Sequence, residues 1–233
     1  MSKLVIAIDG PVGSGKSTVA RRVARLLDYA YVDSGAMYRA IALKAQQLGV
    51  PLDSNAEMTA LAAAAKIGVR SRRSGRGGAQ SVLLDGEEMS SAIRVVEVAE
   101  AASKIAMLPG VREVLVSVQR QAGAEGGVVM EGRDIGSVVF PEADLKIFLT
   151  ASVEVRARRR WQEYLRAGKT ISFEEMINVV QERDRRDSER ETSPLVRAAD
   201  AVFIDSSAME SEEVARTIAM LARTKSGGPA LPG

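Results

Sequence analysis

The residues from Gly10 to Ser17 have the types and spacing of a phosphate-binding loop. They fit the pattern G-x-x-x-x-G-K-S/T, directly after a short apolar run and directly before a helical pattern. In such a loop the glycines let backbone N–H groups turn towards a phosphate, and the helix adds the positive end of its dipole. Lys16 would reach the β- and γ-phosphates, and the Ser17 hydroxyl would take a place on Mg²⁺. The sequence therefore predicts nucleoside triphosphate binding by Gly10, Pro11, Val12, Gly13, Ser14, Gly15, Lys16, Ser17 and Thr18.

Three further groups of charged residues could form a second anionic pocket. The segment from Asp33 to Arg39 lies where an expected strand ends and an expected helix begins. The segment from Glu131 to Asp134 follows another apolar run, at the carboxyl end of a strand, where ligands of open α/β sheets bind. The third group lies on two arginine-rich helices and comprises Arg156, Arg159, Arg160, Arg183, Asp187 and Arg190. A plain helix N-cap at Asp33 or Ser34 and solvated, ion-paired helices are the alternative interpretations.

The other motifs favour a small-molecule kinase among proteins with such a loop. A GTPase needs N-K-x-D and D-x-x-G motifs, and neither occurs in this chain. Motor and AAA-type ATPases need a strand that ends in adjacent acidic residues. The nearest approach is the run from Ala201 to Asp205, but Ser206 and Ser207 follow it, as in an ordinary last strand. A kinase then needs a pocket for its acceptor beside the phosphate loop.

Composition excludes several kinds of site. The 233 residues contain no Cys and no His, so thiolate chemistry, disulfides and an imidazole proton shuttle are impossible. Of the 32 basic residues, 24 are Arg, whose planar fork suits phosphate, although genomic composition is an alternative reason. A net charge of +2 and 4% aromatic residues argue against a dedicated nucleic-acid binder. The segment from Arg70 to Arg76 could be an RGG-like RNA-binding segment, but a solvated hairpin tip is the favoured interpretation.

Short apolar runs that alternate with helical patterns predict a doubly wound, parallel, five-stranded α/β sheet. Strand-like alternation around a Gly-rich turn predicts a small β insertion over 60–93 within a domain of residues 1–225, and residues 226–233 are expected to be flexible. No apolar stretch approaches the roughly 18 residues that span a bilayer, so a cytoplasmic protein without membrane contact is expected. The expected strands are 4–8, 30–32, 128–130, 145–149 and 201–204, and the expected helices are 17–27, 35–48, 94–107, 110–122, 152–167, 173–190 and 210–223.

Taken together, the motifs resemble bacterial cytidylate kinases over nearly the full length. The resemblance rests on Ile8-Asp-Gly-Pro-x-Gly-x-Gly-Lys-Ser17, Asp33-Ser-Gly-Ala-Met-Tyr-Arg39, Val98-Ala-x-x-Ala-Ser103, Val111-Arg-Glu113, Glu131-Gly-Arg-Asp-Ile-Gly136 with Val138-Val-Phe-Pro141, and Glu182-Arg-Asp-x-x-Asp187 with Arg190. The G-F-P-R motif of adenylate kinases is absent. Glu131 departs from the pattern, because many members of the family carry Asp there.

The resemblance implies transfer of a phosphoryl group from ATP to CMP and dCMP, with Mg²⁺ as cofactor and an arginine-rich helical lid over 152–190 that closes over the transferring phosphate. A monomer is the default expectation, because nothing in the sequence points to an interface. The resemblance implies catalytic roles for Lys16, Arg133, Arg156 and Arg160. It also implies that the CMP pocket is formed by Ser34, Arg39, Ser103, Arg112, Arg133, Asp134, Arg183, Asp187 and Arg190. A kinase for another monophosphate or for a hydroxy acid is the alternative enzyme, and a nucleotide-dependent RNA-binding protein is the alternative of another class.

Overall fold

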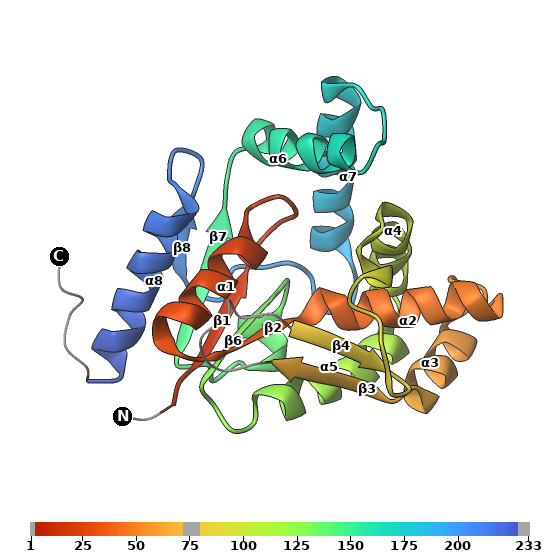
Figure 1. Ribbon diagram of the computed structural model, residues 1–233, viewed down its shortest axis with the longest axis horizontal. Helices are drawn as coiled ribbons and strands as arrows, with labels where there is room; N and C mark the ends of the chain where they lie inside the picture. Colours follow the sequence, from red (N-terminus) through yellow and green to blue (C-terminus); the bar gives the residue numbers. More distant parts are fainter. Residues whose placement is uncertain (1–2, 72–79, 228–233) are drawn as a thin grey trace.

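The computed structural model describes residues 3–71 and 80–227, and its main sheet has five parallel strands (Figure 1). The strands lie in the order β2-β6-β1-β7-β8, so the first strand is central. This arrangement confirms the predicted five-stranded parallel α/β fold. The strands are β1 (Val5–Asp9), β2 (Ala30–Asp33), β6 (Val128–Gly132), β7 (Leu145–Thr150) and β8 (Val202–Asp205).

Helices cover both faces of this sheet because its central strands are apolar on both sides. In β1, Ile6 and Ile8 pack into one core, and Ala7 between them packs into the other. The first core lies under α1 (Lys16–Leu27) and α8 (Ser211–Lys225). The second lies under α2 (Ser34–Leu48), α4 (Val96–Ile105) and α5 (Pro109–Gly123).

A small antiparallel sheet is inserted between α2 and α4. It contains β3 (Ile67–Ser71), β4 (Gln80–Leu84) and β5 (Glu87–Glu88), in that order. The β insertion is therefore confirmed as a three-stranded sheet, and β5 was not expected. The helix α3 (Asn55–Ala64), capped by the Ser54 hydroxyl, precedes the insertion and was also not expected; a short 3₁₀ turn, Ala92–Arg94, follows it. The proposed RNA-binding side chains from Arg70 to Arg76 and the tail residues 228–233 lie outside the described residues.

The Gln80 side chain of the insertion bonds the free edge of the main sheet. The Gln80 amide accepts a hydrogen bond from the Asp33 backbone N–H, with 2.5 Å between the heavy atoms. It also donates to the Asp33 carbonyl at 3.4 Å. Gln80 thus pairs with the end of β2 as a neighbouring strand would.

Two helices form an arginine-rich hairpin with a core of its own. These are α6 (Val153–Arg166) and α7 (Phe173–Glu189), and they lie above the phosphate loop in Figure 1. The helix α7 begins with a capping box, in which Ser172 and Glu175 each bond the other's backbone N–H. Met176, Val180 and Ala157 fill the space between the helices. The term lid hairpin is used below for residues 152–190.

The segment after β6 forms a single π-helical turn, η2 (Ile135–Val139). This turn was not expected from the sequence. In the described parts of the chain, 3–71 and 80–227, no helix combines the length and apolarity needed to cross a bilayer.

Candidate active site

One cavity of about 820 Å³ lies at the carboxyl ends of the strands, between the phosphate loop, α2, α4 and the lid hairpin. Residues from Val12 to Thr18 line one end of it. The structure thus brings together residues that are far apart in the sequence, from Val12 to Val214. The predicted acceptor residues all line this same cavity, and they are Ser34, Arg39, Ser103, Arg112, Arg133, Asp134, Arg183, Asp187 and Arg190.

The phosphate loop wraps closely around its own lysine. Gly13 and Gly15 adopt positive φ values of 75° and 90°, and a side chain at Gly13 would lie 2.7 Å from the Arg156 carbonyl. The Lys16 ammonium donates to the Pro11 carbonyl at 2.7 Å and to the Ser14 hydroxyl at 3.3 Å. Gly10 and Pro11 support the loop but do not line the cavity.

Burial strongly perturbs the Lys16 ammonium. Only 5% of the residue is exposed. This desolvation, with the nearby Arg133 charge, lowers the pKa of Lys16 to about 7. A buried cation of this kind gains much from an anion, because few water molecules compete for it. The loop is therefore arranged to receive a polyphosphate.

Ser17 and Glu131 place two oxygen donors beside Lys16. The Glu131 carboxylate accepts hydrogen bonds from the Tyr31 hydroxyl at 3.0 Å and from the Ser17 hydroxyl. Burial raises the pKa of Glu131, and the nearby Asp33 charge raises it further. Hydroxyl and carboxylate oxygens are hard ligands, and Mg²⁺ is usually held by one or two of them together with substrate phosphates. The donor set at Ser17 therefore fits Mg²⁺.

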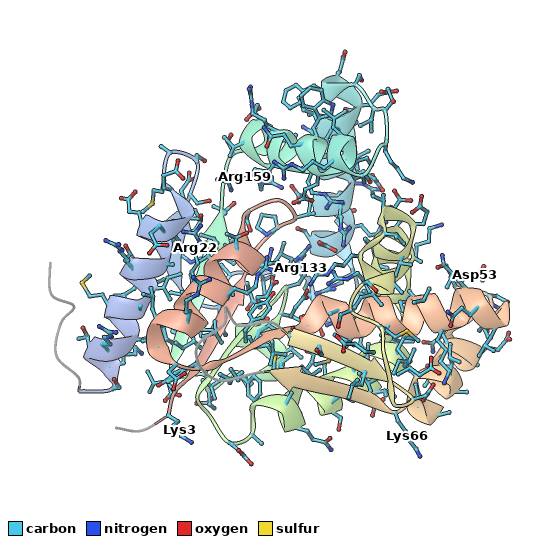
Figure 2. The ribbon with its side chains drawn as sticks, in the orientation of Figure 1. Lys3, Arg22, Asp53, Lys66, Arg133 and Arg159 are labelled. Atoms are coloured by element: carbon cyan, nitrogen blue, oxygen red, sulfur yellow. The ribbon has the colours of Figure 1, made fainter. Side chains whose placement is uncertain are left out.

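The acceptor end of the cavity carries arginines that are paired with carboxylates. Arg39 Nη2 lies 2.6 Å from Asp33 Oδ2, and Arg133 Nε lies 2.7 Å from Asp187 Oδ2. Burial alone would raise the pKa of Asp187, but Arg133 and Arg183 hold it below its usual range. Figure 2 shows Arg133 near the centre of the molecule, between the phosphate loop and α7.

Arg183 is the least compensated of these arginines. Its Nε is buried and lacks a hydrogen-bond partner among residues 3–71 and 80–227. Burial, together with repulsion from Arg133, lowers the pKa of Arg183 to about 10. An unpaired buried donor is costly, and an anion or an acceptor oxygen in the cavity would satisfy it.

A second polar group lies deeper, where α4, α5 and the turn after β6 meet. Arg112 forms a buried ion pair with Asp134, and its guanidinium lies 5.9 Å from the centre of the Tyr38 ring. Arg190 Nη2 lies 3.7 Å from the other Asp134 oxygen. The Ser103 hydroxyl accepts from Arg186 at 3.3 Å, a contact that sequence reasoning missed. These groups present fixed donors and acceptors that could read the edge of a base.

The lid arginines do not share one role. Arg160 lines the cavity and pairs with Glu163 at 2.6 Å. Arg156 does not line it, because its guanidinium is buried against Val12 and Ala151 carbonyls and an Asp184 oxygen 2.7 Å away. This placement favours a role in holding the phosphate loop, and the catalytic role of Arg156 stays a prediction.

Arg159 lines the cavity instead. It is directed from α6 towards the phosphate loop (Figure 2), and its guanidinium donates to the Gly13 and Ser206 carbonyls. The spacing in the sequence put Arg159 between Arg156 and Arg160, but it could not show that Arg159 and Arg160 line the cavity and that Arg156 does not. Asp9, whose carboxylate accepts two backbone N–H bonds behind the loop, gave no signal in the sequence beyond its place before Gly10.

Comparisons with known proteins agree with this arrangement. The family model described as cytidylate kinase matches residues 6–224. A cytidylate kinase of Desulfitobacterium hafniense is 49% identical over 222 residues, which cover 95% of this chain and 94% of that protein. A cytidylate kinase of Pelotomaculum thermopropionicum is also 49% identical, over 95% of this chain and 96% of its own length. A shikimate kinase from Acinetobacter baumannii, solved with shikimate, covers 95% of this chain and 94% of its own chain at 15% identity, with a TM-score of 0.49. The sequence relatives and the matched family, which span nearly the whole chain, show that it belongs to the cytidylate kinase family.

Proposed function

We propose that this chain transfers the γ-phosphoryl group of ATP to CMP and dCMP. In this reaction an oxygen of the CMP phosphate forms a bond to the γ-phosphorus. The bond from the γ-phosphorus to the β–γ bridging oxygen breaks, and its electron pair leaves with ADP. CDP or dCDP is the other product.

The observation that carries the proposal is the continuity of the cavity. Its phosphate-loop end contains the buried Lys16, and its other end contains Arg39, Arg133 and Arg183 within the same 820 Å³. Two phosphate-bearing ligands that enter from the two ends would meet with their phosphates between these cations. Holding both reactants in line is most of what phosphoryl transfer requires of a protein.

Each part of the acceptor has a candidate partner. Arg39 and Arg133 would hold the CMP phosphate, since a guanidinium can donate two parallel hydrogen bonds to it. Ser103, Arg112 and Asp134 would meet the edge of cytosine. Arg183 and Asp187 would reach the ribose, and Arg190 would support Asp134. Because Asp187 can accept a bond from a sugar hydroxyl, we expect dCMP to bind somewhat less tightly than CMP.

No general base is needed in this scheme. A phosphate monoester has a second pKa of about 6, so it is already mostly dianionic at pH 7. The chain, which has no His, therefore has to position the acceptor rather than deprotonate it. The missing imidazole is consistent with this chemistry.

The chain's own cations stabilise the negative charge of the transferring group. Lys16 would contact the β- and γ-phosphates, and Arg160 of the lid hairpin would approach from the opposite side. Ser17, with Glu131 beside it, would hold Mg²⁺, which when bound supplies positive charge next to the β- and γ-phosphates. Closure of the lid hairpin would exclude water from the transfer.

An acceptor panel tests the proposal. The purified chain is incubated with ATP, Mg²⁺ and one acceptor at a time, namely CMP, dCMP, UMP, AMP, GMP or shikimate, and ADP release is followed in a coupled assay. We expect kcat/KM for CMP and dCMP to exceed that for each of the others by tenfold or more. A higher value for another acceptor would refute the assignment, and ADP release without any acceptor would indicate an ATPase.

A further inference from the structure

The Asp9 carboxylate connects the end of the phosphate-loop strand to the segment that carries the acceptor residues. Asp9 is the last residue of β1 and directly precedes Gly10. Its Oδ1 accepts from the Ile135 N–H at 2.8 Å, and its Oδ2 accepts from the Gly136 N–H at 2.7 Å. Only 6% of the residue is exposed. The two carboxylate oxygens therefore accept hydrogen bonds from two consecutive backbone N–H groups inside the protein.

These two bonds fix the backbone at one end of the short span between the sheet and the turn. The register between β1 and β6 ends where Asp9 faces Gly132. The next backbone groups that Asp9 fixes are the N–H groups of Ile135 and Gly136. Arg133 and Asp134 are thus the two residues between the end of the sheet and the Asp9 anchor. Both side chains line the acceptor end of the cavity.

The anchor also explains why a π-helical turn can form there. The first N–H groups of a helical turn have no partner within the turn itself. In the turn Ile135–Val139, the Asp9 carboxylate supplies these partners from another strand. The Asp134 carbonyl accepts the first bonds inside the turn, from Val138 at 2.9 Å and Val139 at 3.1 Å. The orientation of Asp134 therefore depends on the turn, and the turn depends on Asp9.

Gly136 leaves little room for a side chain beside the anchor. A Cβ at this position would lie 3.1 Å from the Lys146 side chain and 3.4 Å from Asp9 Oδ2. The contact with Asp9 is an ordinary one, but the contact with Lys146 is tight, so Lys146 or the turn would have to move by a few tenths of an ångström. A side chain at Gly136 therefore crowds the turn beside the Asp9 bonds.

We propose that Asp9 is a positioning residue for the acceptor nucleotide, which holds Arg133 and Asp134 in place by anchoring the backbone that follows them. Asp9 lies next to the donor loop, yet its side chain acts on the acceptor end of the cavity. Its removal is expected to weaken CMP binding much more than ATP binding. This inference rests on the proposed function only in naming CMP as the acceptor.

The first test is Asp9→Asn, which keeps the size of the side chain but turns one acceptor into a donor that faces a backbone N–H. We expect the Kd for CMP, measured by calorimetry without ATP, to rise about tenfold or more, since a buried bond to a charged group is lost. The KM for ATP should change by less than about threefold. Amide exchange at Ile135 or Gly136, measured by NMR, should become faster.

Ile218→Ala serves as the stability control. Ile218 is fully buried in α8, in the core on the opposite side of β1, and does not line the cavity. It should lower the melting temperature without changing the Kd for CMP. An equal loss of CMP affinity in Ile218→Ala and Asp9→Asn would reduce Asp9 to a stabilising residue and overturn the proposal. Unchanged CMP affinity in Asp9→Asn would overturn it as well.

Two further measurements keep the test decisive. Gly136→Ala retains the carboxylate but crowds the turn against Lys146, so it should weaken CMP binding in the same direction, by about threefold, even if Asp9→Asn fails to fold. In a double-mutant cycle, the loss of CMP affinity in the variant with both Asp9→Asn and Asp134→Asn should be smaller than the sum of the losses in the two single variants, because Asp9 acts through the backbone of Asp134. Additive losses would contradict this route. If the wild type binds no CMP, the proposed function fails, and the same variants are then compared on the acceptor that the panel identifies.

Discussion

Arg39 and Asp33 form a 2.6 Å ion pair at the N-terminus of α2, and the Asp33 carboxylate also caps this helix by accepting a hydrogen bond from the Ala36 N–H at 3.1 Å. Asp33 therefore holds the Arg39 guanidinium in the cavity before any ligand binds. Arg39→Ala should raise the KM for CMP by tenfold or more and leave the KM for ATP within about twofold, as expected for a lost phosphate contact. Steady-state kinetics with each substrate varied in turn measures both values. Equal effects on the two KM values would remove Arg39 from the acceptor side.

Lys16→Ala should be nearly inactive. The ammonium is the buried cation of the phosphate loop, and a charge clamp on a transferring phosphoryl group contributes about 10³-fold or more to the rate. The coupled ADP assay measures the loss, with Lys225→Ala as the control, since Lys225 is exposed at the end of α8. Wild-type turnover in Lys16→Ala would refute the mechanism.

The rate at low ATP should depend on pH through the same residue. Only the protonated ammonium attracts phosphates, and burial lowers the pKa of Lys16 to about 7. In the free enzyme the proton is therefore lost as the pH rises through about 7, and kcat/KM for ATP should fall between pH 7 and 9. Bound phosphates favour the charged form, so kcat at saturating ATP should hold to higher pH.

Lys16→Arg provides the comparison for this pH profile. A guanidinium stays charged throughout this range, so the variant should be slower but should lose the alkaline fall. A flat kcat/KM profile for ATP in the wild type from pH 7 to 9 would be incompatible with the lowered pKa.

Arg156 and Arg160 should separate stability from turnover. Arg156→Ala removes the 2.7 Å ion pair with Asp184 and the two hydrogen bonds to the Val12 and Ala151 carbonyls. We expect a loss of about 3 kcal/mol in the free energy of unfolding, measured in urea. Arg160→Ala removes a helix-surface pair with Glu163 and a contact 5.4 Å from the centre of the Tyr164 ring, and should cost about 1 kcal/mol. The kcat of Arg160→Ala should nevertheless fall. An Arg156→Ala variant that is as stable as the wild type but inactive would support a catalytic role for Arg156.

The sequence predicted those parts of the fold that depend on local pattern. The phosphate loop needs a strand, glycines, a lysine and a helix in direct succession, so the motif at Gly10–Ser17 contains all of its own context. The helix α3 was not predicted because it is rich in alanine and because only Met58 and Ala62 of its ten residues are buried. A helix with so narrow a buried face has little periodicity to detect.

Tertiary contacts account for what the sequence could not predict in the site. The turn at Ile135 is capped by Asp9, which lies 126 positions away, so no local pattern announces it. Arg156 and Arg160 are four residues apart on one helix, which predicts that they face the same way. Arg156, however, pairs with Asp184 of the neighbouring helix and does not line the cavity. The sequence shows which segments are rich in charged residues. It does not show where each arginine side chain points, because that depends on the group with which the side chain pairs.

The Gln80 amide has a consequence for solubility. A sheet edge with unpaired N–H and C=O groups is a template for strands of other molecules, and β2 is one edge of the main sheet. By bonding both the N–H and the C=O of Asp33, Gln80 occupies the edge where it borders the cavity. At the end of β2 a single side chain thereby takes the two bonds that a strand of another molecule would need for pairing.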